Sequence, residues 1–440
     1  MTRKTPKKQE RGLCELYEND PERADRVVFG RVAENDRRGF LKGAGLATMG
    51  AIVGTSIPFS RNMPAGLIPQ ALAQDKKDFK IEGKEGMTVH NDRPINAETP
   101  AHLLDPDLTP NKHFFVRNNG LVPEKASDPD AWELTIDGEV NSPMKIKLGD
   151  LKRQFTNVTI QGQLECGGNG RMGFNPPARG NQWTVGAVGN ARWKGVRMAD
   201  VLKKAGLKPS AVYTGHEGAD PHLSRDPKKL SISRGVPMHK ALDPETLIVW
   251  EMNGEALPLI HGGPLRVVAP GWPGSCSQKW LKRIWVRDKE HDGPGMTGVS
   301  YRVPAFPVAP GTKVANKDMA VINSMPVKSV ITYPKSGTKV AADKPVMVRG
   351  HAWAGDLQVK EVHVSVDFGA TWQKADLKAA PNAHAWQRWS AQIKLPMKGY
   401  YEIWARATDD RGVSQPVVIP GWNPRGYLNN SSHRISVTAA

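Results

Sequence analysis

The sequence predicts a mixed α+β domain followed by an all-β sandwich, with an N-terminal export signal in front of both. Three observations lead to this prediction. The 440 residues exceed the size of one ordinary domain. The 43 glycines and 35 prolines indicate many turns and few long helices. The apolar pattern also changes after about Ser324, where alternation with a period of two begins.

The first part, residues 75–322, mixes short strands, turns and a few helices. Met198–Ala205 has the apolar spacing of a helix and is followed by Gly206, a residue type common at helix C-caps. Residues 265–270 and 281–286 have the apolar composition of strands. No regular alternation of strand and helix and no glycine fingerprint for a nucleotide phosphate is present. The pattern therefore predicts an α+β domain.

In the second part, apolar residues alternate with polar residues over residues 362–368 and 401–405. Turn-forming residues interrupt these runs at 367–370 and 409–412. Short strands of period two with turns between them are typical of a β-sandwich. A loop rich in Pro and small residues, 303–323, precedes the change in pattern. The predicted division of the chain is residues 1–73, 74–327 and 328–440.

The N-terminal region resembles a twin-arginine export signal. Arg37 and Arg38 are followed by Phe-Leu-Lys and then by a weakly apolar stretch, residues 43–58. Cleavage is expected after Ala73. The stretch is too short and too rich in glycine for a stable membrane span, and a basic amphipathic helix within the fold is the alternative. The signal predicts a periplasmic protein that is exported after it has folded.

Charge and cysteine content limit the classes of function. The formal net charge is +17, but the basic residues are scattered and no nucleic-acid-binding motif is present, so a small anionic substrate or an acidic partner is favoured over nucleic acid. The cysteines, Cys14, Cys166 and Cys276, are too few for a disulfide framework. Neither CxxC nor CxxCH occurs, so a zinc–cysteine cluster and covalently attached c-type haem are not expected in this chain.

The segment Leu-Glu-Cys-Gly-Gly-Asn-Gly-Arg, residues 164–171, is the strongest candidate for a metal site. It places Cys166 at the end of an expected strand, beside glycines whose backbone can approach a ligand closely. Arg171 could favour the thiolate, the form that binds metals. A buried structural cysteine in a tight turn is the alternative interpretation.

Two further segments carry basic residues among turn formers. Arg117 lies in residues 114–120, where it is either an exposed arginine at a strand end or a clamp for an oxyanion. Residues 261–266 and 277–279 bring His, Arg and Lys close together around Gly and Pro. They form either a site for a polyanion such as a phosphate or a solvated basic surface.

With these motifs in order, the mature chain resembles the sulfite oxidase family over nearly all its length. The matching segments are residues 95–100, 115–118, 164–171, 186–193, 213–220, 250–258, 261–271, 279–281, 421–426 and 433–434. The resemblance implies a molybdopterin-binding catalytic domain of the sulfite oxidase type, followed by an immunoglobulin-like dimerisation domain. It therefore implies a molybdenum–molybdopterin cofactor and a homodimer.

The resemblance also implies roles for individual residues. Cys166 matches the cysteine that binds molybdenum. The residues implied to hold the molybdopterin are Phe115, Val116, Arg117, Asn118, Asn119, Asp220, His261, Arg266, Ser277, Gln278 and Lys279. The residues implied to form the catalytic substrate pocket are Arg117, Arg171 and Arg425, with Trp183 as a wall of the pocket.

The sequence departs from the family pattern at two positions. Animal members have His where this chain has Asn119, and they carry an active-site Tyr where simple alignment places Ile232. Either another residue takes the role of that Tyr or the substrate differs. No haem-binding domain is visible in the sequence, so electrons are expected to leave through a separate c-type cytochrome.

The sequence thus predicts a periplasmic enzyme that oxidises sulfite to sulfate with molybdenum. Two alternatives stay open. One is another oxidoreductase of the same fold, such as a sulfane dehydrogenase-like subunit of a sulfur-oxidation complex or a methionine-sulfoxide reductase. The other is an exported binding module without catalytic activity, which would contain no molybdenum.

Overall fold

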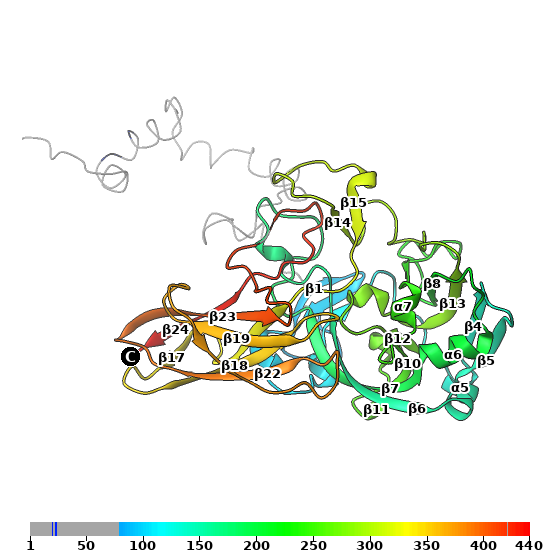
Figure 1. Ribbon diagram of the computed structural model, residues 1–440, viewed down its shortest axis with the longest axis horizontal. Coiled ribbons are helices and arrows are strands. Elements are labelled where there is room, and N and C mark those ends of the chain that lie inside the picture. Colours follow the sequence, from blue (N-terminus) through cyan, green and yellow to red (C-terminus); the bar gives the residue numbers. More distant parts are fainter. Residues whose placement is uncertain (1–19, 21–22, 24–78, 420) are drawn as a thin grey trace, which may run out of the picture. The chain divides into compact units, whose positions relative to one another are not determined.

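The computed structural model describes Asp20, Arg23 and residues 79–419 and 421–440. The expected export signal, its cleavage site after Ala73 and Cys14 lie outside the described residues. Residues Lys80–Ala440 form one compact unit. Its secondary structure is mostly sheet (Figure 1), as the sequence predicted.

Between residues 80 and 327, the described strands form three sheets and a β-ribbon. The first sheet contains β1 (Thr88–Asp92), β2 (Ile95–Glu98) and β3 (Val116–Arg117). The second contains β6 (Asn157–Glu165), β7 (Val188–Arg197), β10 (Leu247–Met252), β11 (Glu255–Ala256) and β12 (Arg266–Val268). The third contains β4 (Glu133–Gly138), β5 (Met144–Lys147), β8 (Tyr213–Gly218), β9 (Ser233–Arg234) and β13 (Leu281–Arg287). The ribbon pairs β14 (Arg302–Pro304) with β15 (Met319–Val321).

The described helices are short. The α-helices are α5 (Leu148–Gln154), α6 (Met198–Ala205) and α7 (Met238–Ala241). The 3-10 helices are η1 (Ala101–Leu104), η2 (Asn111–His113), η3 (Pro129–Ala131), η4 (Arg171–Gly173), η5 (Leu259–His261), η6 (Gly274–Cys276) and η7 (Asn316–Asp318). Helix α6 has the predicted bounds. It ends at Gly206, whose φ of 71° is left-handed and whose N–H donates to carbonyls of the last turn.

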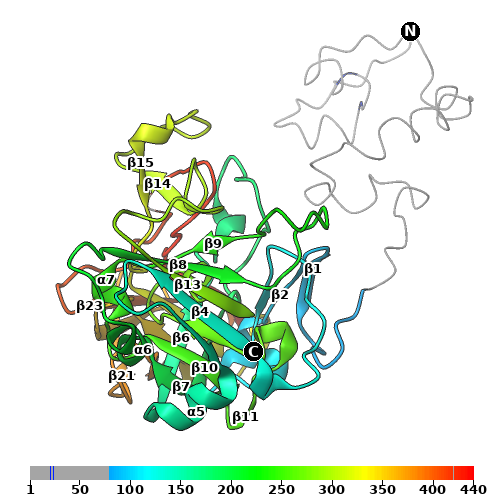
Figure 2. The ribbon, with the colours of Figure 1, turned by 90° about the vertical axis from the view of Figure 1, so that its right-hand side faces the viewer.

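The two five-stranded sheets share one apolar core. Leu134 and Ile136 of β4, Ile248 of β10, and Val201 and Leu202 of α6 are all fully buried in it. Figure 2 shows β13 between β8 and β4, which it pairs in antiparallel and parallel fashion respectively. Strands β6 and β7 form a long antiparallel pair that runs from Asn157↔Val196 to Glu165↔Val188. The residue that follows Glu165 is therefore held at the end of a rigid hairpin.

The second part is a sandwich of two sheets (Figure 1). One sheet has the order β16-β18-β22-β21, and its strands are β16 (Lys328–Tyr333), β18 (Val346–Trp353), β21 (Asp376–Leu377) and β22 (Gln387–Ile393). The other has the order β17-β24-β23-β19-β20, and its strands are β17 (Thr338–Val340), β19 (Val359–Ser365), β20 (Gln373–Lys374), β23 (Gly399–Asp409) and β24 (His433–Ala439).

The alternation seen in the sequence explains the interior of the sandwich. Val362, Val364, Ile403 and Ala405 are buried in its core. The turn predicted at residues 367–370 is confirmed: β19 stops at Ser365, and Phe368, the last apolar residue of the alternating run, is 65% exposed in that turn. The strand ends there because the Asp367 and Ser365 side chains accept hydrogen bonds from backbone N–H groups of the turn.

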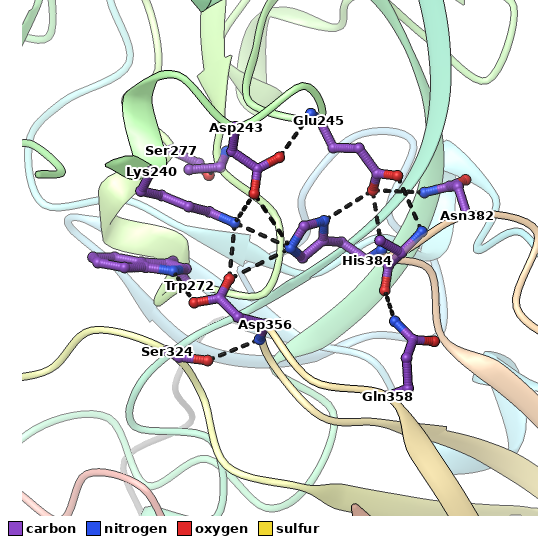
Figure 3. A network of polar contacts seen from close by, with 12 residues as sticks. Lys240, Asp243, Glu245, Trp272, Ser277, Ser324, Asp356, Gln358, Asn382 and His384 are labelled. Carbon is purple, nitrogen blue, oxygen red and sulfur yellow. Dashed lines mark hydrogen bonds and ion pairs between the residues drawn. The ribbon is translucent and has the colours of Figure 1, made fainter. Parts of the chain in front are cut away.

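An ion cluster joins the two parts (Figure 3). The Lys240 ammonium of α7 is 3.1 Å from Asp243 Oδ2, 2.9 Å from Asp356 Oδ1 and 3.1 Å from His384 Nε2. Among the described residues, these three partners are the only group of three or more His, Cys, Asp or Glu side chains close enough to surround one metal ion. The ammonium already supplies the positive charge at their centre. We therefore interpret the cluster as an anchor between the two parts.

The described residues contain no helix that has both the length and the apolar character needed to cross a bilayer.

Candidate active site

A pocket with about 670 Å³ of space free of protein atoms brings most of the predicted cofactor residues together. All of the predicted cofactor-binding residues except Val116 line it, and Cys166 lines it as well. Its other lining residues are Phe114, Leu164, Ile232, Gly274, Ser275, Trp280 and Tyr301. Val116 lies in β3 and is fully buried.

Cys166 is the first residue after β6 and is 6% exposed. Its N–H donates to Ala187 O at 2.9 Å, and its carbonyl accepts from Asn169 N at 2.8 Å. The turn has glycine at position 170, where the φ of 93° is a left-handed conformation that residues with a side chain rarely adopt. The tight-turn interpretation is therefore correct for the backbone, and the turn places the thiol at the wall of the pocket.

Glu165 anchors this turn to the sandwich. Its carboxylate is 1% exposed and accepts hydrogen bonds from Lys328 Nζ at 2.9 Å and Trp353 Nε1 at 2.8 Å. Asn169 Nδ2 also donates to it, at 2.9 Å. Because Lys328 and Trp353 come from β16 and β18, the sandwich fixes the position of the cysteine-bearing turn. No pattern in the sequence indicates this contact, because its partners are far apart along the chain.

Buried basic groups gather at one end of the pocket. Lys84 Nζ lies 2.6 Å from His261 Nε2, Arg266 Nη1 donates to His261 O at 2.7 Å, and Lys279 Nζ donates to Asn118 Oδ1 at 2.7 Å. Burial lowers the pKa of Lys84 to about 7 and that of Arg266 to about 9. Burial and the neighbouring cations lower the pKa of His261 and Lys279 well below their usual values.

This cluster fits a bound anion. The neighbouring cations lower the pKa of Lys279, whereas the Asp220 carboxylate raises it. Burial raises the pKa of Asp220 itself to about 6. Collecting several cations in a buried site is costly unless an opposite charge enters with the ligand. The phosphate of a molybdopterin provides such a charge.

Unpaired polar atoms give a second indication of a ligand. Asn118 Nδ2 and Gln278 Oε1 are buried at the pocket, and neither has a hydrogen-bond partner among the described residues. Buried amides in folded proteins nearly always have partners. A group with several hydrogen-bonding edges, as a pterin has, would satisfy both atoms. The residues present therefore fit the implied cofactor.

The three predicted substrate arginines lie differently. Arg117 lines the pocket, and its Nη2 donates to Asn119 Oδ1 at 2.8 Å. Arg171 is 6% exposed and does not line the pocket; its Nε donates to Arg425 O at 2.6 Å, and its Nη1 donates to Asn181 O at 2.9 Å. Arg171 and Arg425 thus meet through the backbone of Arg425. Their convergence with Arg117 on one substrate stays a prediction.

Trp183 lies behind the pocket rather than in its lining. It is fully buried in the core that also contains Phe115 and Cys166, and its ring meets His90 edge-on at 4.6 Å. Its indole N–H has no hydrogen-bond partner among the described residues. Its role as a wall of the substrate pocket stays a prediction.

Sequence reasoning missed Lys84 and Tyr301. Lys84 precedes β1 in a stretch without a motif, and 177 residues separate it from His261. Tyr301 lies between β13 and β14, in the segment that leads toward the sandwich. Only the folded chain brings Tyr301 to the pocket and Lys84 to His261, which lines it.

Comparison with known proteins identifies the family. The family model described as oxidoreductase molybdopterin binding domain matches residues 119–295, and the one described as Mo-co oxidoreductase dimerisation domain matches residues 319–440. Mitochondrial sulfite oxidase of Rattus norvegicus is 35% identical over 374 residues, which cover 80% of this chain and 65% of the relative. The chain thus spans slightly less than two thirds of the rat protein's length.

Two other proteins extend the comparison. Sulfite oxidase of Gallus gallus is 35% identical over 79% of this chain and 77% of its own length. The crystal structure of the sulfane dehydrogenase SoxCD from Paracoccus pantotrophus superposes with a TM-score of 0.65 at 26% identity, covering 86% of this chain and 96% of that chain. The fold, the pocket and these similarities together show that the chain belongs to the sulfite oxidase family of molybdopterin-dependent oxidoreductases.

Proposed function

We propose that the protein oxidises sulfite to sulfate in the periplasm and passes the electrons to a separate c-type cytochrome. The observation that carries the proposal is one pocket that is lined by Cys166, by Arg117 and by the basic residues His261, Arg266 and Lys279. Sulfite and water give sulfate, two protons and two electrons. When bound, the molybdenum cofactor supplies the redox chemistry of this conversion.

The residues of the chain would bind the cofactor and orient the substrate. The Cys166 thiolate would hold the metal, and His261, Arg266 and Lys279, which line the pocket, would hold the phosphate of the cofactor, with Lys84 in contact with His261. Arg117 would offset the charge of the sulfite dianion and orient it. The family name of residues 319–440, a dimerisation domain, supports a homodimer.

Replacing the arginines one at a time tests the substrate site. We expect Arg117→Gln, Arg171→Gln and Arg425→Gln each to lower kcat/KM for sulfite about ten- to a hundredfold, because each removes a charge-assisted hydrogen bond from the dianion. The Arg171→Gln and Arg425→Gln variants should keep their molybdenum. The Arg117→Gln variant should lose molybdenum to the extent that the neighbours of Arg117 hold the cofactor. Steady-state kinetics with metal content measured in each variant checks this.

Arg→Lys variants at the same positions serve as matched controls for charge. They should also lose activity, since a point charge does not reproduce the planar fork of a guanidinium. Near-normal kcat/KM in Arg117→Gln and Arg171→Gln at full metal loading would show that sulfite binds elsewhere.

A sulfane dehydrogenase activity is the second candidate. Two observations favour it: the superposition on SoxCD, and Ile232 at the position where the animal sulfite oxidases carry a tyrosine. Assays with sulfite and with a thiol-bound sulfane as competing substrates separate the candidates. A higher kcat/KM for the sulfane would replace our proposal with the alternative.

The compartment can be tested independently of the chemistry. We expect the double variant Arg37→Lys/Arg38→Lys to accumulate as a folded, uncleaved precursor in the cytoplasm, because the paired arginines are the defining feature of the export signal. Cell fractionation followed by immunoblotting measures this. Normal recovery of the double variant from the periplasm would contradict the twin-arginine interpretation.

A further inference from the structure

Tyr301 places a phenol in the wall of the pocket that contains Cys166 and Arg117. It is 7% exposed, and its hydroxyl lies 3.5 Å from Asn119 Oδ1. The same Asn119 oxygen accepts from Arg117 Nη2 at 2.8 Å. The side-chain amide of Asn119 therefore links the Tyr301 hydroxyl to the Arg117 guanidinium, which we assign to substrate binding.

The position of Tyr301 is strongly determined. Its ring stacks on that of Tyr427 at a centroid distance of 5.5 Å, and the Arg234 guanidinium lies 4.8 Å from its centroid. Its N–H donates to Tyr427 Oη at 3.3 Å. Its φ of 51° is a conformation that aromatic residues rarely adopt. Such backbone conformations persist where surrounding contacts enforce them, and they concentrate at functional sites.

Arg234 itself needs explanation, because it is 1% exposed and its hydrogen-bond partners among the described residues are a thioether, a hydroxyl and a backbone carbonyl, with no carboxylate. It donates to Ser275 Oγ at 2.8 Å and to Met296 Sδ at 3.2 Å. Both Ser275 and Tyr301 line the pocket. Because the buried Arg234 guanidinium contacts both Ser275 and the Tyr301 ring, it holds these two residues of the pocket wall in place.

The two departures from the family pattern meet at Tyr301. Its hydroxyl contacts Asn119, and its side chain belongs to the same buried apolar cluster as Ile232. The segment between β13 and β14 thus brings a hydroxyl to the part of the pocket where position 232 provides none.

We infer that Tyr301 is a substrate-binding residue that donates its hydroxyl hydrogen bond to an oxygen of the sulfur oxyanion. This inference rests on the proposed function. A phenol is a neutral donor, so it orients the anion beside Arg117 without adding charge. In the absence of substrate the hydroxyl donates to Asn119. Substrate binding exchanges that long contact for a hydrogen bond to an anion, which is a stronger one.

The test is Tyr301→Phe, which keeps the ring and its stacking and removes only the hydroxyl. We expect kcat/KM for sulfite to fall about ten- to a hundredfold. Titration calorimetry with sulfate, the product dianion, should show binding weakened by a similar factor in the molybdenum-loaded protein. Molybdenum content and Tm should equal those of the wild type. Tyr400→Phe, at a tyrosine that is 63% exposed, is the matched control and should change none of these values.

The outcomes separate the inference from the proposed function. A wild type that binds sulfate but does not oxidise sulfite would overturn the proposed function, and the sulfate titration would still decide the role of Tyr301. Wild-type kinetics and sulfate binding in Tyr301→Phe would overturn the inference alone. Loss of molybdenum or of thermal stability in Tyr301→Phe would show a structural role for the hydroxyl and would also overturn it.

Discussion

Cys166→Ser is expected to abolish sulfite oxidation. A serine hydroxyl does not ionise near neutral pH and does not offer the soft thiolate that the metal requires. The wild type should contain about one molybdenum per chain, since Cys166 is the only thiol that lines the pocket. Steady-state oxidation of sulfite and metal analysis of the purified variant measure the effect.

Cys276→Ala is the matched control. Cys276 is fully buried in the apolar core and does not line the pocket. We expect this variant to keep its molybdenum and most of its activity, with a loss of about 1 kcal/mol in the free energy of unfolding. Full activity in Cys166→Ser would remove the basis for the metal site.

Glu165→Gln is expected to have the second largest effect, on stability and cofactor content together. Glu165 and Lys328 have side chains that are 1% and 7% exposed, and 2.9 Å separates their charged atoms. The variant leaves the Lys328 ammonium buried without a carboxylate, which costs about 3–5 kcal/mol. The turn that carries Cys166 also loses its anchor on the sandwich, so molybdenum content should fall. Urea unfolding and metal analysis measure the two effects.

Two further variants make this prediction sharper. Glu251→Gln removes a partner from the more exposed Lys194–Glu251 pair and should cost less than about 1 kcal/mol. The double variant Glu165→Gln/Lys328→Met should be more stable than Glu165→Gln, because no unpaired charge stays buried. Equal stability of Glu165→Gln and the wild type would show that the sandwich does not anchor the turn.

Local patterns predicted local structure well. Helix α6 was predicted with its bounds because apolar spacing and a C-capping Gly206 are both visible within a few residues. The interior of the sandwich was predicted because alternation along a strand reports directly on burial. The turn at residues 367–370 was predicted from its turn-forming residues, and the hydrogen bonds that the Ser365 and Asp367 side chains accept from the backbone end the strand before the apolar alternation stops.

The candidate site was predictable where its residues lie in motifs. Residues around Cys166, Arg117 and His261 lie in short segments rich in glycine and polar residues, and the pocket brings these segments together. Contacts between segments that are distant along the chain leave no motif in the sequence. The Glu165–Lys328 pair spans 163 residues, and Tyr301 follows no recognisable motif. Register and packing of whole sheets determine these contacts, and composition over a short window does not report them.

The most direct test of the proposed function is anaerobic addition of sulfite to the oxidised, molybdenum-loaded protein, followed by addition of an oxidised c-type cytochrome. We predict that sulfite reduces the metal, that sulfate forms in equal amount, and that visible absorbance then shows reduction of the cytochrome. Cys166→Ser should give neither sulfate nor reduced cytochrome. Full molybdenum loading of the wild type without any reduction by sulfite would contradict the account.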